Sequence, residues 1–373
     1  MTPTLFAFGS NGSGQLGIGH DEDVSVPTRC IFEADSAVNT VSLSSTVSRI
    51  IAGGNHTLVL LTDGRVYLAG WGESVFKRVV VTVSKTGTQY GLFKGVAAMW
   101  GGSVLVASDA DRSDAVFVVG TGVKGELGLG PDVTHVPGTG TRIPDFPPPD
   151  VKIVSVAGAM GHVVAVCSDG SVYGWGASRK GQLGAELASE KIVWTPRRIN
   201  LGGMGVDLAV TDAVCGREFT VLCGDKEKGE FAILGPGSGS PADKDRWGIR
   251  PDNPTSEDVK RYLRVHTSWH GIYVHQKDQS IRAWGRNDRG QLPPDDLGRV
   301  KEAAVGSEHC LALLDDERGR SVVAFGWGEH GNCGPETDAR GDVKGVSARI
   351  PLPEDVEVVG VGAGCATSWI IAS

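Results

Sequence analysis

The sequence lacks several features that would each point to a definite class of protein. No apolar run approaches the ~18 residues that a membrane-spanning helix needs, and the opening MTPTLFAFGSNG has neither the charged part nor the apolar part of a secretion signal. No block of Lys and Arg stands out, and 36 Lys and Arg against 44 Asp and Glu give a net charge of −8. We therefore expect a soluble protein that is not exported and binds neither membrane nor nucleic acid directly.

Cysteine is also scarce. Seven cysteines are scattered through 373 residues, an odd number without any Cys-x-x-Cys pair. This spacing favours reduced thiols over a disulfide framework or a zinc knuckle. The expected location is a reducing compartment, the cytoplasm or the nucleus.

Glycine, in contrast, is abundant. The 54 glycines are about twice the usual share, and they follow no Gly-X-Y period, which excludes collagen. Apolar residues make up 40% of the chain and charged residues 21%. Such a composition can bury a sizeable core and differs from that of a disordered chain.

Two phrases alternate along the chain and divide it into seven repeats. One is a short apolar strand that ends in glycine, often followed by Gly-x-Leu-Gly, as in VYGWGASRKGQLG from Val172. The other precedes it, as in VSVAGAMGHVVAVCSDG from Val154. The strand-ending glycines are Gly9, Gly70, Gly120, Gly176, Gly235, Gly285 and Gly326, at intervals of 61, 50, 56, 59, 50 and 41 residues. A recurring unit of about this length is typical of propellers and related repeat folds.

Each repeat carries the signals of a small antiparallel sheet. Apolar positions alternate, and Asp-Gly links adjacent strands at Asp63 and Asp169. The last repeat stops at Ser373 without its partner strand, whereas the chain opens on such a strand at 4–10. These features predict an all-β, seven-bladed β-propeller, closed by the N-terminal strand, which joins the C-terminal blade and removes an open sheet edge.

The propeller is expected to form a single domain over residues 1–373. Departures from the repeat predict insertions near 73–94, 131–150 and 236–258. A short peripheral helix is expected after Pro254, because Thr255 and Asp258 have the spacing of a capping box.

The alternating phrases G-x-x-H-[ST]-x-x-[LV], D-G-x-[VL]-[YW]-x-[WF]-G and N-x-x-G-Q-L-G resemble the regulator of chromosome condensation repeat family over the entire chain. That resemblance implies a propeller, but members of the family serve as exchange factors, ubiquitin-ligase parts or interaction platforms, so the fold does not fix the function. The opening FAFGSNGSGQLGIGHDEDVSVP, with His20-Asp21-Glu22-Asp23 as its most distinctive part, is similar to fungal single-propeller members.

The narrower resemblance implies a partner protein. This is the small, acidic, metal-binding (zinc or iron) electron carrier of diphthamide biosynthesis, which also serves Elongator-dependent modification of wobble uridines in tRNA. On this interpretation the chain is a non-catalytic subunit of a heterodimer, with the Elongator complex as a further partner. The resemblance transfers no contact residues, because the matching motif belongs to the scaffold.

Sequence patterns that suggest catalysis or a cofactor are better explained by structure. The stretches from Gly12 and from Gly120 fit G-x-G-x-x-G, but no helix follows either of them, as a dinucleotide site requires. Histidine recurs at one position of the repeat in His56, His162 and His309, with Phe219 and, less clearly, His270 in two other repeats. A position filled by His or Phe indicates packing. No Ser-His-Asp set and no Walker loop is present, so we expect no enzyme, no catalytic or metal site and no cofactor.

Tryptophan gives the most informative candidates for partner contacts. Trp247 lies with Arg246 and Arg250 in a predicted insertion, a basic and aromatic segment that suits an acidic partner; the alternative is a loop tryptophan folded onto its own blade. A second candidate surface comes from loop-like positions of two late repeats. Its residues are Trp269, His270, Trp327, Glu329 and His330.

Two functions of different class follow. The first is a non-enzymatic interaction or regulatory subunit that binds the carrier and supports diphthamide modification of elongation factor 2 and tRNA wobble uridine modification. The alternative is a guanine-nucleotide exchange factor for a small GTPase, as the founding member of the family is. The net charge of −8 disfavours the chromatin contact that accompanies the second function.

Overall fold

The computed structural model describes residues 3–33, 45–83, 86–108, 113–202, 208–236, 254–316, 321–353 and 356–373. Apart from one short helix, α1 (Ala185–Ala188), the regular elements of these residues are all β-strands. The chain divides into two compact units, Met1–Arg78 with Leu263–Ser373, and Val79–Tyr262. Within the described residues no helix has the length and apolar character needed to span a membrane.

The first unit holds four antiparallel sheets, which we call blades 1, 5, 6 and 7. Blade 1 is β3 (Val47–Ala52), β4 (His56–Leu61), β5 (Val66–Gly70) and β6 (Glu73–Arg78). Blade 5 is β20 (Tyr262–Thr267), β21 (Gly271–Gln276) and β22 (Ile281–Gly285). Blade 6 is β23 (Val300–Val305), β24 (His309–Leu314), β25 (Val322–Trp327) and β26 (Asp342–Arg349). Blade 7 is β27 (Val358–Ala363), β28 (Thr367–Ala372), β1 (Thr4–Gly9) and β2 (Val24–Arg29).

The second unit holds blades 2, 3 and 4. Blade 2 is β9 (Gly95–Ala98), β10 (Gly102–Ala107), β11 (Ala115–Thr121) and β12 (His135–Arg142). Blade 3 is β13 (Ile153–Ala159), β14 (His162–Cys167), β15 (Val172–Ala177) and β16 (Ile192–Arg198). Blade 4 is β17 (Asp212–Cys215), β18 (Thr220–Cys223) and β19 (Phe231–Leu234), and a two-stranded ribbon pairs β7 (Val81–Thr82) with β8 (Gln89–Tyr90). With seven blades, the fold is the predicted all-β, seven-bladed β-propeller.

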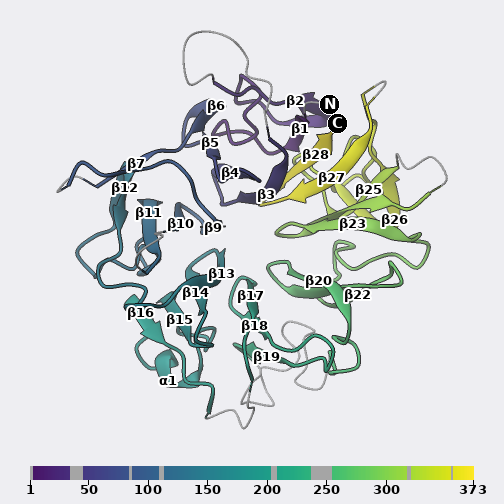
Figure 1. Cartoon of the computed structure of the whole chain (residues 1–373). Coiled ribbons are helices and arrows are strands. Elements are labelled where there is room, and N and C mark those ends of the chain that lie inside the picture. Colours follow the sequence, from purple (N-terminus) through teal and green to yellow (C-terminus); the bar gives the residue numbers. More distant parts are fainter. Residues whose placement is uncertain are drawn as a thin grey trace. The chain divides into compact units, whose positions relative to one another are not determined.

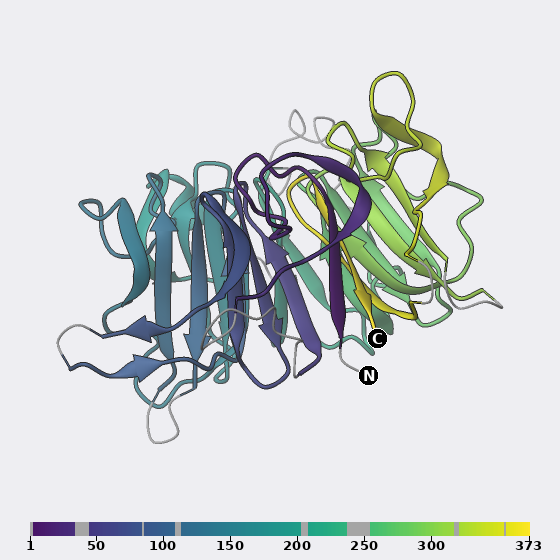
Figure 2. The same ribbon diagram turned by 90° about the horizontal axis from the view of Figure 1, so that it is seen from above.

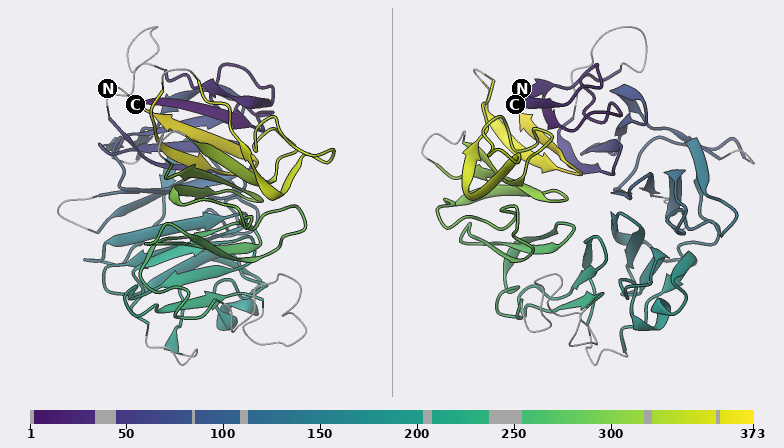
Figure 3. Two further views of the ribbon diagram at one scale, coloured as in Figure 1. Left: turned by 90° about the vertical axis from the view of Figure 1, so that its right-hand side faces the viewer. Right: turned by 180° about the vertical axis from the view of Figure 1, so that it is seen from behind.

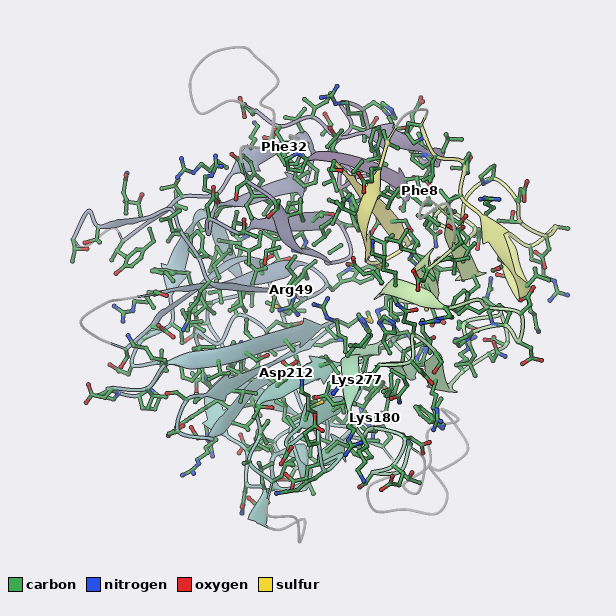
Figure 4. All side chains as sticks on the ribbon, turned by 45° about the vertical axis from the view of Figure 1, so that its right-hand side comes forward. Phe8, Phe32, Arg49, Lys180, Asp212 and Lys277 are labelled. Atoms are coloured by element: carbon green, nitrogen blue, oxygen red, sulfur yellow. The ribbon has the colours of Figure 1, made fainter. Side chains whose placement is uncertain are left out.

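The two ends of the chain share blade 7, as predicted. Strand β1 pairs with β28 over six residues, from Thr4 opposite Ala372 to Gly9 opposite Thr367. Figure 1 shows the termini side by side, and Figure 2 shows the purple N-terminal strand against the yellow C-terminal one. Phe8 of β1, marked in Figure 4, is buried in one apolar cluster with Phe325 and Ile370. The N-terminal strand therefore contributes to the core as well as to the ladder.

The strand-ending glycines have a common backbone conformation that explains why they recur. All seven have positive φ, from 93° at Gly120 to 142° at Gly235, which L side chains rarely adopt. A Cβ at Gly176 would lie 2.8 Å from the Cα of His162, and one at Gly326 would lie 2.8 Å from the Cα of His309. Glycine is thus required where the third strand of a blade passes closest to the start of the second.

Two of the predicted insertions contain ordinary parts of the fold. The segment 73–94 includes β6, the fourth strand of blade 1, as well as the β7–β8 ribbon, and 131–150 includes β12. These outer strands were missed because they are largely exposed and carry no alternating apolar pattern. Of the third segment, residues 237–253 lie outside the described part of the chain.

The helix predicted after Pro254 does not form. The capping-box bonds are present, since the Thr255 backbone N–H and hydroxyl both donate to Asp258 Oδ2, at 2.9 and 2.7 Å. The segment nevertheless stays a single turn, because β20 begins at Tyr262 and leaves no room for a second turn. All seven cysteines are free thiols.

Candidate interaction site

In each antiparallel blade the loop between the first and second strands and the loop after the third strand lie at the same end, which we call the loop end. Blades 5, 6 and 7 place their loop ends together within the first unit, since backbone hydrogen bonds join them. The Trp269 N–H donates to Ser307 O at 2.9 Å, and the Ser307 N–H donates to Gly364 O at 2.9 Å. Figure 3 shows these green and yellow blades beside the purple N-terminal strand.

Trp327 is the centre of an aromatic and polar cluster at this end. It is half-buried, and its indole N–H donates to Glu329 Oε2 at 3.0 Å. The ring of His330 meets it edge to face, with centroids 5.4 Å apart. The guanidinium of Arg289, from blade 5, lies 5.9 Å from the ring centroid and bonds Asp342 at 3.3 Å. The arrangement combines an aromatic centre with exposed charged groups, as binding surfaces commonly do.

His330 joins this cluster to the distinctive N-terminal loop. Its Nδ1 lies 2.8 Å from Asp23 Oδ2, and the other oxygen of Asp23 accepts the backbone N–H of Asn11 at 2.6 Å. The Asn11 side chain in turn donates to His20 O at 2.7 Å. Residues far apart in the sequence are thus held in one surface, which extends from blade 6 to the 10–23 loop of blade 7.

Glu308 connects the Trp269–His270 loop to Trp327. Its carboxylate lies 2.8 Å from His270 Nδ1 and accepts Gln291 Nε2 at 2.8 Å, while its backbone carbonyl accepts the Trp327 N–H at 2.9 Å. Burial favours a raised pKa for Glu308, but the hydrogen bonds from His270 and Gln291 and the nearby positive charges hold that pKa below its ordinary value. A charged carboxylate therefore underlies the cluster.

The expectation that His270 is a surface contact is wrong. His270 is only 5% exposed, because its ring lies between blades 5 and 6 and forms a hydrogen bond with Glu308. The other predicted contacts are more accessible: Trp269, Trp327 and His330 are half-buried, and Glu329 is exposed. The structure brings these residues to one end of two neighbouring blades, and His270 belongs to the support beneath them.

His270 also does not occupy the recurring histidine position. That position faces the strand-ending glycine: His162 pairs with Gly176 and His309 with Gly326, but in blade 5 it is Gly271 that pairs with Gly285. His270 stands one residue earlier, at the position that Glu308 fills in blade 6. The repeat alignment was shifted by one residue there.

Two of the recurring histidines, His162 and His309, form hydrogen bonds to the next blade, in agreement with a structural role. His162 Nε2 lies 3.0 Å from the Thr220 hydroxyl of blade 4, which donates to Gln182 O at 2.8 Å. The same arrangement recurs at the boundary of blades 6 and 7. There His309 Nε2 lies 2.9 Å from the Ser368 hydroxyl, which donates to Asn332 O at 2.7 Å. Because the hydroxyl hydrogen is used on the carbonyl, the imidazole must donate from Nε2. Burial lowers the pKa of both histidines to about 4, so both are neutral.

Trp71 is a candidate that sequence reasoning did not select. It is 37% exposed, has a left-handed backbone with φ 55°, and stacks on the buried ring of His56 at 4.3 Å. A bulky residue held in this conformation is uncommon and often marks a functional position. The next residue donates its N–H to Ser13 O at 3.0 Å, which ties Trp71 to the 10–23 loop. The signal was its place directly after a strand-ending glycine, which it shares with Trp327.

Three predicted contact residues cannot be placed. Arg246, Trp247 and Arg250 lie outside the described residues. Within the described ranges, no group of three or more His, Cys, Asp or Glu is arranged to hold a metal ion. The loop end of blades 5 to 7 is therefore the site that the described residues support best.

Seven blades with glycine at the end of each third strand place the chain in the class of repeat β-propellers. The comparisons agree: residues 4–60 and 169–223 match the "Regulator of chromosome condensation (RCC1) repeat", and residues 151–182 match a second description of that repeat. The RCC1 repeat-containing protein C10F6.04 of Schizosaccharomyces pombe is 30% identical over 98% of both chains. The chain belongs to the RCC1 repeat family.

More distant relatives carry names that describe exchange factors. The mouse secretion-regulating guanine nucleotide exchange factor is 25% identical over 96% of this chain and 82% of its own length. Among solved structures, Prp20p of Saccharomyces cerevisiae, studied with its binding to Gsp1p and histones, aligns over 100% of this chain and 92% of its own with a TM-score of 0.67 and 17% identity. Yeast RCC1 (Prp20) bound to Kap60 aligns with a TM-score of 0.71, 18% identity, and 100% and 89% coverage. At this identity the structural likeness concerns the fold.

Proposed function

We propose that this chain is a non-enzymatic binding subunit, and that its partner is the small, acidic, metal-binding electron carrier of diphthamide biosynthesis. Through that carrier it would support diphthamide modification of elongation factor 2 and Elongator-dependent modification of tRNA wobble uridines. The partner is proposed from the likeness of the opening segment to the fungal alpha-tubulin suppressor, also called killer-toxin-insensitivity protein thirteen.

The observation that carries the proposal is the Trp327 cluster. A partly exposed tryptophan with a satisfied indole N–H, flanked by charged groups, is the usual anatomy of an interface anchor. Arg289 and the neighbouring Arg286 are the positive side chains beside the cluster. Each already forms an ion pair, with Asp342 and Asp288 respectively, which an acidic partner would share. When the carrier is docked here, the propeller would cover part of the carrier's metal site. This would reduce solvent access to the metal and so change its reduction potential. Arg246, Trp247 and Arg250 remain proposed contacts of the same acidic partner.

The proposal is tested by measuring the affinity of the purified chain for the purified carrier. Trp327→Ala is expected to weaken the complex by at least about 30-fold, the effect of losing an anchor worth ~2 kcal/mol. Trp100→Ala is the matched control, because Trp100 is also an exposed tryptophan but belongs to blade 2 in the other unit. Equal affinities for wild type and Trp327→Ala would remove the cluster from the interface, and failure of the wild type to bind would end the proposal.

The second candidate function is guanine-nucleotide exchange on a small GTPase. It is favoured by the names of two relatives, the mouse exchange factor and the yeast exchange factor SRM1, the latter 25% identical over 69% of this chain and 62% of its own. A nucleotide-release assay with a panel of small GTPases distinguishes the two functions. Acceleration of release at catalytic amounts of the chain would replace the first proposal with the second.

A further inference from the structure

Blade 5 has three strands, whereas the other blades of its unit, blades 1, 6 and 7, have four. Residues 254–316 are fully described, and they hold β20, β21 and β22 followed by a loop at 286–299 without a strand. Blades 6 and 7 each add a fourth strand outside the third, β26 and β2 respectively. Strand β22 is therefore the outer edge of its sheet within the described residues.

The exposure of β22 agrees with this open edge. None of its five residues is buried, whereas five of the six residues of β25, the equivalent strand of blade 6, are buried. Leu292 and Leu297 of the loop that follows pack against the same apolar cluster as Ile281 and Ala283, and the loop adds no strand. The strand thus has apolar support on its faces and no partner strand along its edge.

The backbone groups of Ile281 and Ala283 point outward along that edge. Hydrogen bonds from the Arg286 N–H to His270 O, at 3.0 Å, and from the Gln276 N–H to Ser280 O, at 2.9 Å, fix which residues of β22 bond β21. Because antiparallel pairs alternate, Arg282 and Trp284 bond β21 while Ile281 and Ala283 face away from it.

Complete blades show what these outward groups normally do. Val322 stands at the position of Ile281 in blade 6, and its carbonyl accepts the Ile350 N–H at 2.9 Å, just beyond β26. In blade 3, Val172 accepts the Ile199 N–H in the same way, at 2.8 Å. Within the described residues the carbonyl of Ile281 has no such donor. An extended segment laid along β22 would supply one.

The charge around β22 selects the kind of segment. Residues 263–299, which include the loop after β22, contain six Lys or Arg and four Asp, in a chain whose net charge is −8. Arg282 on β22 is exposed, Arg286 follows the strand, and Lys277, marked in Figure 4, lies in the turn between β21 and β22. A segment bearing Asp or Glu matches this local excess of positive charge.

We propose that the edge of β22 is a docking site for an extended acidic segment of the partner, which adds as a fourth, antiparallel strand and completes blade 5. Main-chain hydrogen bonds to Ile281 and Ala283 would give the affinity, and Arg282 would favour carboxylates. The identity of the partner rests on the proposed function, but the docking mode itself does not.

Amide hydrogen exchange tests this directly. In the free protein the amides of Ile281 and Ala283 are expected to exchange fast, and those of Val322 and Ala324, in the covered strand β25, slowly. Two probes are used: the purified carrier, and a synthetic peptide of alternating valine and glutamate, with a lysine-for-glutamate peptide as its control. Strong protection of Ile281 and Ala283 with the carrier or the acidic peptide, and weaker protection with the basic peptide, supports the inference.

Each other outcome has a definite meaning. Slow exchange of the two amides in the free protein would show that the chain itself covers the edge, and the inference would fall. Protection by the acidic peptide without carrier binding would keep the inference and end the proposed function. A carrier complex in which neither the carrier nor the acidic peptide protects the edge would keep the proposed function and overturn the inference.

A substitution gives a second readout. Ala283→Pro removes the outward N–H without taking a donor from the β21 ladder, so the blade is expected to keep its fold. It should weaken binding of the protecting probe at least tenfold, whereas Ala283→Val, which keeps the N–H, should change it less than threefold. Equal binding by both variants with unchanged thermal unfolding would contradict strand addition.

Discussion

At the scale of the residue, glycine is the constraint that makes the repeat visible. The strand-ending glycines stand where the backbone has positive φ and where the first atoms of the second strand leave no room for a Cβ. Selection acts here on backbone geometry, so the same residue type returns in every blade while its neighbours vary. A close-approach glycine is therefore more informative about this fold than any single apolar residue.

Gly176→Ala tests that claim. At this position φ is 100° and a Cβ would meet the backbone of Gly161 and His162, so the free energy of unfolding is expected to fall by about 2 to 4 kcal/mol. The control is Gly138→Ala in blade 2, where a Cβ meets nothing within 4 Å. Urea unfolding of the two variants should separate them clearly, and equal losses would show that the close approach has no special cost.

At the scale of the element, blades are joined by matched polar pairs as well as by apolar packing. Where the recurring position is histidine, as at His162 and His309, the next blade presents a hydroxyl, from Thr220 and Ser368. Where it is glycine, as at Gly271, the next blade has Cys310. At the two histidine boundaries the facing blades are therefore complementary in their hydrogen-bonding groups.

The neutral state of these histidines gives stability a pH dependence. The pKa of His162 is about 4 in the folded protein and ~6.5 when unfolded, so the unfolded state binds more protons between these values. Stability is therefore full above pH 6.5 and is lost as pH falls toward 4, by up to roughly 3 kcal/mol for this group.

His162→Gln is the matched variant, because its amide can still donate to the Thr220 hydroxyl. Unfolding by urea at pH 7 and pH 4.5 should show a smaller loss of stability in the variant than in the wild type. The carboxylates titrate in both proteins and cancel in the comparison. An unchanged difference between the two pH values would mean that His162 is already accessible to protons when folded.

At the scale of the whole molecule, the sheet shared by the two termini is the decisive feature. Strand β1 has a partner on each side, β28 and β2, so it cannot be removed without opening two ladders. Its side chains, Leu5, Ala7 and Phe8, are buried in the cores of the first unit. The integrity of blade 7 therefore depends on the first few residues of the chain.

Removal of residues 1–9 is expected to abolish cooperative unfolding or to produce aggregates, because β28 and β2 would both expose unpaired edges. Removal of residues 1–3 is the control, because it leaves β1 (Thr4–Gly9) intact. Size-exclusion chromatography and thermal unfolding report both effects. A 1–9 deletion that stays monomeric and melts within a few degrees of the control would refute the structural importance of this pairing.

Much of this could be predicted from the sequence because the information is local and repeated. Glycine at a fixed place, Asp-Gly turns and alternating apolar positions predicted seven blades. They also predicted that the N-terminal strand joins the C-terminal blade. The outer strands were missed because they are half-exposed and lack that alternation. The burial of His270 was missed because its position in the loop is one residue away from that in the other repeats.

The sequence by itself determined the class of fold, the number of blades and the sharing of one sheet by both ends, since each follows from backbone requirements that recur with the repeat. Only the tertiary structure decided which loops meet: Trp327 with Arg289, His330 with Asp23, and His270 with the buried Glu308. It also decided that, within the described residues, β22 is the outer strand of blade 5. Such contacts join residues from different blades, so no local pattern encodes them, and they depend on how packed sheets bring distant loops to one end.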